Sequence, residues 1–137
     1  MDIIDDLRKI VIASIKQLVN EHKKGRLQNF ESIAIEIPKG NIKGDYSTNA
    51  AMIIAKYFSS SPKEIGEKLK NKLMQSNLID SVSVEGPGFL NIILHQNVWT
   101  EMLSDILLIT NRYGKLDLGQ KRKVNVEFVS ANPTGPL

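Results

Sequence analysis

The sequence predicts an α+β fold, with a small, mostly antiparallel sheet covered by helices. Up to residue 114, helical and strand-like patterns follow in the order helix, strand, helix, helix, two strands, helix. A short Gly-Pro-Gly turn joins the two adjacent strands, and such a connection predicts a hairpin. The length of 137 residues suits one domain with a short additional segment.

The composition argues against several classes of protein. The chain has no cysteine, so it has neither a disulfide framework nor a thiolate site. The N-terminus is acidic, unlike a targeting segment, and no apolar run approaches the roughly 20 residues of a membrane span. We therefore expect a cytoplasmic protein with no membrane partner. With 18 Lys+Arg against 15 Asp+Glu, the net charge of +3 favours a polyanionic partner only weakly.

Two elements are predicted before residue 40. A helix is expected over residues 3–19, because apolar residues recur at steps of three and four: Ile3, Leu7, Ile10, Val11, Ile15, Leu18 and Val19. Residues 32–37 alternate with period two and Pro38 ends them, which predicts a half-buried strand. A turn is expected over residues 40–45.

Two helices are predicted after this turn. Ser47 is the expected N-cap of the first, a run of small and helix-favouring residues that reaches about residue 56. The second begins at the capping box Ser61-Pro62-Lys63-Glu64 and carries Ile65, Leu69, Leu73 and Met74 on one face.

The predicted hairpin consists of residues 82–85 and 89–94. Asn97 is the expected N-cap of a last helix that ends near residue 114 and has Trp99, Met102, Leu103, Ile106 and Leu107 on one face. A polar linker follows at residues 115–122, and residues 123–129 alternate like a strand. This strand has no sheet of its own, so residues 123–137 look like the start of a second domain.

Few residues of the chain could support catalysis. His22 and His95 have no acidic or nucleophilic partner at a recognisable spacing, and we expect a structural or surface role for both. No metal-ligand motif is present, and no helix follows the glycines at 86–88, as a phosphate loop would require. The sequence therefore predicts no catalytic residue and no metal site.

Strand alternation makes the hairpin more informative. Phe89 and Asn91 share one face with Ile93, and the other face holds Leu90, Ile92 and Leu94. If the purely apolar face is the core face, a ring and an amide are exposed together, which suits one unstacked RNA base. A buried Phe89 beside an incidentally exposed Asn91 fits the same periodicity.

The C-terminal strand pattern contains a second candidate site. Glu127 lies on the face opposite Val124, Val126 and Phe128, and the loop after the strand contains Ser130 and Asn132. Open α/β sheets place ligand contacts at this end of their strands. A solvated strand residue is an equal alternative for Glu127.

Three stretches, residues 44–52, 86–91 and 126–137, resemble segments of bacterial arginyl-tRNA synthetases in family order. The last, Val-Glu-Phe-Val-Ser-Ala-Asn-Pro-Thr-Gly-Pro-Leu, looks like the segment before that family's HxGH signature. The resemblance covers the whole chain. It implies an N-terminal additional domain at residues 1–114, a linker at 115–122 and the start of a Rossmann-type class I catalytic domain at 123–137.

The resemblance also implies a function and site residues. The family joins arginine to its tRNA, using ATP with Mg. Its additional domain contacts the tRNA D-loop through an aromatic residue and an amide two positions apart, which fall on Phe89 and Asn91. Its arginine pocket draws on residues that match Glu127, Ser130 and Asn132, a partial pocket here.

The chain ends before the family's HxGH and KMSKS motifs, so we expect it to be inactive alone and to hold no cofactor. Two hypotheses follow: a tRNA-recognition module, or a small protein-docking or spacer domain without affinity for RNA. Binding to RNA should weaken steeply with salt, because phosphate contacts release counterions, whereas an apolar docking surface should not respond in this way. The sequence gives no oligomeric state.

Overall fold

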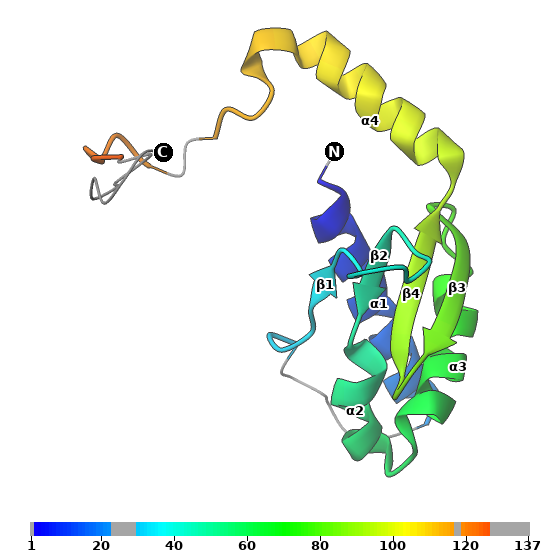
Figure 1. Ribbon diagram of the computed structural model, residues 1–137. Helices are drawn as coiled ribbons and strands as arrows, with labels where there is room; N and C mark the ends of the chain where they lie inside the picture. Colours follow the sequence, from blue (N-terminus) through cyan, green and yellow to red (C-terminus); the bar gives the residue numbers. More distant parts are fainter. Residues whose placement is uncertain (1, 23–29, 117–118, 127–137) are drawn as a thin grey trace, which may run out of the picture.

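The computed structural model describes residues 2–22, 30–116 and 119–126 (Figure 1). The expected α+β class is confirmed. In chain order, the elements of this described part are α1 (Ile3–Glu21), β1 (Ile35–Glu36), β2 (Tyr46–Thr48), α2 (Ala50–Phe58), α3 (Pro62–Leu73), β3 (Ile79–Glu85), β4 (Phe89–Leu94), α4 (Gln96–Ile109) and the short 3-10 helix η1 (Thr110–Arg112).

The four strands form one antiparallel sheet in the order β1-β2-β4-β3. The predicted hairpin is therefore confirmed as β3 and β4, and β4 also pairs with β2 on its other side. Helices α1, α2 and α3 cover one face of the sheet (Figure 1).

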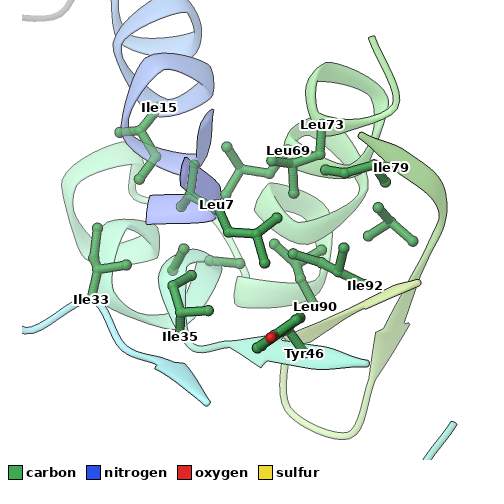
Figure 2. Packing of buried hydrophobic residues seen from close by; sticks show 14 of the residues in the cluster. Leu7, Ile15, Ile33, Ile35, Tyr46, Leu69, Leu73, Ile79, Leu90 and Ile92 are labelled. Atoms are coloured by element: carbon green, nitrogen blue, oxygen red, sulfur yellow. The ribbon is translucent and has the colours of Figure 1, made fainter. Parts of the chain in front are cut away.

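The core lies between these helices and the sheet (Figure 2). The apolar stripe of α1 is confirmed, with Leu7, Val11 and Ile15 fully buried. Alternate residues of β4, Leu90, Ile92 and Leu94, face this core, as the alternation predicted. Removing one such side chain typically lowers the free energy of unfolding by about 2–5 kcal/mol, so this packing fixes the position of β4.

Helix α3 begins as predicted and packs closely on the sheet. Ser61 Oγ accepts from the Glu64 backbone N–H, and Glu64 Oε2 accepts from the Ser61 backbone N–H, which completes the capping box. Gly66 is buried on the side of α3 that faces β3, where a Cβ atom would lie 2.9 Å from Val84 Cγ1. The helix approaches the sheet this closely because residue 66 has no side chain.

The region around residue 47 differs from the prediction. Ser47 is not an N-cap: residues 46–48 form β2, and α2 starts three residues later. Asn49, at the N-cap position of α2, makes no side-chain cap hydrogen bond. Its Oδ1 instead accepts from the Ala34 N–H at 2.9 Å, and its Nδ2 donates to the Ser32 carbonyl at 3.2 Å. These side-chain bonds replace strand pairing there, and β1 is shorter than the predicted strand 32–37.

Helix α4 extends away from the sheet (Figure 1). It starts at Gln96, with His95 rather than Asn97 at the N-cap position. Of the predicted apolar face, Trp99 and Met102 pack partly against the core, while Leu103 and Leu107 are 56% and 67% exposed. The periodicity identified the helix correctly, but most of its apolar face has no partner within the described residues.

The predicted strand at residues 123–129 is not confirmed. Residues 123–126 have no strand conformation, and residues 127–137 lie outside the described part. Among the described helices, none is both long and apolar enough to cross a membrane.

We expect the substitution Gly66→Ala to destabilise the domain by roughly 0.5–2 kcal/mol. Crowding against Val84 costs about 1–3 kcal/mol, and the better helix propensity of alanine offsets about 0.5–1 kcal/mol of this. Urea unfolding followed by circular dichroism measures the difference. The control is Asn71→Ala on the exposed side of α3, which should not lower stability. A G66A variant as stable as the parent protein would contradict close packing at this position.

Candidate functional site

A pocket of about 520 Å³ lies beside Ser47, Phe89 and Asn91 of the sheet and reaches Met52 of α2. Its lining comes mainly from β1, β2 and β4 and from the loop at residues 37–43 between β1 and β2. The end of β3 with the turn after it, the start of α2 and the residues just before β1 and α2 contribute the rest. Small-molecule sites in proteins typically have about 300–1,000 Å³, so the pocket can hold a group of the size of a nucleobase.

The strand register explains why these side chains meet. Ser47 pairs with Glu36 on one side and with Asn91 on the other. Residues directly opposite each other in a sheet point to the same face, so these three form a row across three strands. Phe89 lies two residues before Asn91 on this same face and pairs with Glu85 across the hairpin.

Phe89 is 41% exposed and lines the pocket, which confirms the expected outward direction of its ring. Asn91 also lines the pocket but is only 3% exposed, so the expectation that its amide is exposed beside the ring was wrong. The loop after β1 folds back over this part of β4 and covers it. At Gly44, which has a φ of +148°, a Cβ atom would lie 3.2 Å from Asn91 Cβ.

The Asn91 amide has no hydrogen-bond partner within the described part of the chain. Every fully enclosed side-chain nitrogen or oxygen of the described residues is paired, so the unpaired amide must reach the open volume of the pocket. Buried amides are nearly always hydrogen-bonded in proteins. A polar group inside the pocket, from water or from a ligand, is therefore the natural partner of Asn91.

Residues 44–49 fasten the covering loop to β4. The Asp45 N–H donates to the Ile92 carbonyl, and Asp45 Oδ2 accepts from the Leu94 N–H, both at 2.8 Å. Burial raises the pKa of the Tyr46 hydroxyl, and the carboxylates of Asp45 and Asp2 raise it further, so this hydroxyl stays protonated at neutral pH. The hydrogen bonds of this segment give it a structural role.

Charges around the pocket are mixed. Two exposed carboxylates, Glu36 and Glu85, and one exposed ammonium group, Lys39, contribute to the lining. Phosphate sites are built from positive groups and free backbone N–H groups. The pocket is therefore better suited to an uncharged group with hydrogen-bonding edges than to a phosphate.

The other predicted site residues are placed differently. Glu127, Ser130 and Asn132 lie outside the described residues, and their role stays a prediction. His22 Nε2 lies 3.3 Å from the Lys68 ammonium nitrogen of α3, and His22 Nδ1 lies 2.9 Å from the Leu18 carbonyl oxygen of α1. His22 therefore links α1 to α3. His95, for which no acidic partner was expected, lies 3.4 Å from Asp80 Oδ1, an exposed contact that contributes little to stability.

No group of three or more potential metal ligands occurs in the described ranges. Sequence reasoning missed the loop residues of the pocket, including Ile37 and Ile42. Two large apolar side chains in an otherwise polar loop were a usable signal, but periodicity does not detect it.

Fold and pocket together define a small α+β domain with an aromatic ring and an unpaired amide in one pocket. Residues 5–94 match the family described as the arginyl tRNA synthetase N terminal domain. The chain belongs to this family.

Similar proteins agree with this assignment. The arginine–tRNA ligase of Ruegeria sp. (strain TM1040) is 42% identical over the whole chain, which covers 24% of that protein. That of Rickettsia felis is 39% identical over the whole chain and is covered to 23%. The chain thus spans about a quarter of the length of these relatives.

The fold resembles part of the Thermus thermophilus arginyl-tRNA synthetase, with a TM-score of 0.55 and 18% sequence identity. The match covers 72% of this chain and 15% of that one. At this identity the likeness concerns the fold alone.

We expect Gly44→Ala to destabilise the domain by about 1 kcal/mol or more beyond the effect of Gly40→Ala. Both glycines have positive φ angles, so both substitutions strain the backbone, but a Cβ at residue 40 meets no atom within 4 Å. The difference therefore combines the crowding against Asn91 and Tyr46 with the greater backbone strain at the φ of +148°. Urea unfolding of both variants measures it, and equal losses would show that the loop does not rest on β4.

Proposed function

We propose that this chain is the tRNA-contacting N-terminal domain of an arginine–tRNA ligase. The carrying observation is the pair Phe89 and Asn91, an exposed ring and an unpaired, buried amide in one pocket on one sheet face. Membership in the arginyl tRNA synthetase N terminal domain family supports the proposal, as do the arginine–tRNA ligases similar over the whole chain.

The chemistry of the pair suits a single unstacked nucleobase. Proteins recognise RNA in loops by stacking a splayed base on an aromatic ring and by hydrogen-bonding its edge. The Phe89 ring provides the stacking surface, and the Asn91 amide offers a donor and an acceptor deeper in the pocket. We assign the base to the tRNA D-loop, in keeping with the resemblance of residues 86–91 to the family motif.

The complete ligase would attach arginine to this tRNA with ATP and Mg, in the cytoplasm and without a membrane partner. Glu127, Ser130 and Asn132 would contribute to its arginine pocket. A carboxylate matches the two-pronged guanidinium group, while a hydroxyl and an amide can hold the α-amino and carboxylate groups of the amino acid. The remaining walls of that pocket would come from the rest of the enzyme.

A docking or spacer domain is the second candidate function. The observation that favours it is the exposed apolar surface of α4, where Leu107 and Leu108 are 67% and 80% exposed. Contiguous apolar surface of this kind commonly marks a protein contact. The two functions use different parts of the molecule, so they can be separated by substitutions in the pocket.

We expect Phe89→Ala to weaken binding of arginine tRNA by about 5- to 150-fold, the range of one lost base–aromatic stack. Asn91→Ala should also weaken it, because the edge contacts of the base are lost. Fluorescence anisotropy of labelled tRNA, at two salt concentrations, measures the affinity of this chain and of the complete ligase.

Ile93→Ala is the matched control for both pocket variants. Ile93 lies on the same strand and the same face, is 37% exposed against 41% for Phe89, and does not line the pocket. Its affinity for tRNA should equal that of the parent protein. If neither pocket variant changes the affinity of the complete ligase, the tRNA contact does not involve this pair, and the docking function gains support.

For the amino-acid site, we expect Glu127→Gln to raise the KM for arginine of the complete ligase by roughly 10- to 150-fold. A hydrogen bond to a charged group contributes about 1.5–3 kcal/mol, and the glutamine amide cannot pair with a guanidinium group on both sides. The affinity for tRNA should not change. An unaltered KM would remove Glu127 from the arginine pocket.

A further inference from the structure

We propose that the loop at residues 37–43 supplies a second wall of the Phe89 pocket, so that an inserted nucleobase lies between the Phe89 ring and the side chains of Ile37 and Ile42. This inference rests on the proposed function, because it assumes that an RNA base enters the pocket. It adds two residues that determine how tightly the base is held.

The first observation is the exposure of these two side chains. Ile37 is 72% exposed and Ile42 is 52% exposed, yet both line the pocket together with Phe89. Exposing an isoleucine side chain to water is unfavourable in free energy, and covering it with a flat apolar surface lowers the free energy. The two faces of a nucleobase provide such a surface, one for the ring and one for the loop.

The second observation is that both ends of the loop are fixed. Before it, Ile35 and Glu36 pair with β2. After it, Asp45 is held to β4 by the two hydrogen bonds of its N–H and its carboxylate. The wall therefore has a defined position relative to Phe89, and less ordering entropy is lost when a ligand binds between preorganised surfaces.

The third observation is the polar group within the pocket. Asn91 is almost completely buried, and its amide has no partner among the described residues. Ile37 and Ile42 line the same pocket as Asn91, so a ligand that pairs with the amide shares the pocket with both isoleucines. A planar group with a hydrogen-bonding edge meets both requirements, with its faces against the apolar walls and its edge toward the amide.

The charges of the pocket exclude a simpler explanation, that the loop binds phosphate through Lys39. Two carboxylates, Glu36 and Glu85, contribute to the same lining and would repel a phosphate group. The loop's contribution to affinity should therefore come from apolar contact with the base. Such contact releases no counterions, so it should not change the salt dependence of binding.

The experiment measures the affinity of the complete ligase for arginine tRNA with Ile37→Ala and Ile42→Ala. Each variant should bind about 3- to 10-fold more weakly, as expected when part of an isoleucine surface is no longer covered. The slope of log affinity against log salt should be unchanged. Ile4→Ala, an isoleucine 46% exposed on α1, is the matched control and should bind like the parent protein.

A second set of measurements tests what the loop touches. Transfer RNAs that each lack one D-loop base are titrated against the parent ligase, and the position with the largest loss identifies the inserted base. With that abasic tRNA, Ile42→Ala and Phe89→Ala should cause no further loss, because their contact is already absent.

The outcomes separate this inference from the proposed function. If Phe89→Ala weakens binding while both isoleucine variants bind like the parent protein, the second wall is wrong and the tRNA contact stands. Equal losses by the isoleucine variants with intact and with abasic tRNA would also overturn it, since the loop would then touch another part of the RNA. If Phe89→Ala and Asn91→Ala have no effect, both proposals fall.

Discussion

The pairing of β2 with β4 is the constraint on which the candidate site depends. It places Ser47 opposite Asn91. Next to β2 on either side, Asp45 accepts a hydrogen bond from Leu94 of β4, and Asn49 accepts one from Ala34 before β1. Without this pairing, the loop at residues 37–43 would have no fixed end, and Asn91 would be an exposed amide on an open strand. The pocket is thus a consequence of one short strand of three residues.

One face of β4 packs in the core, and the other face contributes to the pocket. Leu90, Ile92 and Leu94 are buried against α2 and α3, so the strand cannot shift without disturbing the core. Phe89 and Asn91, between them in sequence, point the other way into the pocket. A one-residue slip in register would exchange these faces, and the packing of the core therefore also fixes the orientation of Phe89 and Asn91.

The pocket and α4 represent two different kinds of surface. The pocket combines apolar walls with one unpaired amide, an arrangement that selects by shape and by hydrogen bonding. The outer part of α4 presents apolar side chains without a comparable polar group, which is the character of a packing surface. In the two proposed functions, the pocket contacts RNA and the last helix contacts another protein segment.

The sequence by itself determined the long helices, the hairpin, the capping box and the shared face of Phe89 and Asn91, because each of these follows from local periodicity or from residues three apart. Periodicity alone left open whether Phe89 is exposed or buried, and the structure shows the ring exposed. Only the tertiary structure decided that residues 46–48 form a strand rather than a helix start, that Asn91 is covered, and that Ile37 and Ile42 join the site. These features arise from backbone pairing between distant segments, whose hydrogen bonds outweigh the local preference of Ser47 for an N-cap and leave no periodic signal in the loop.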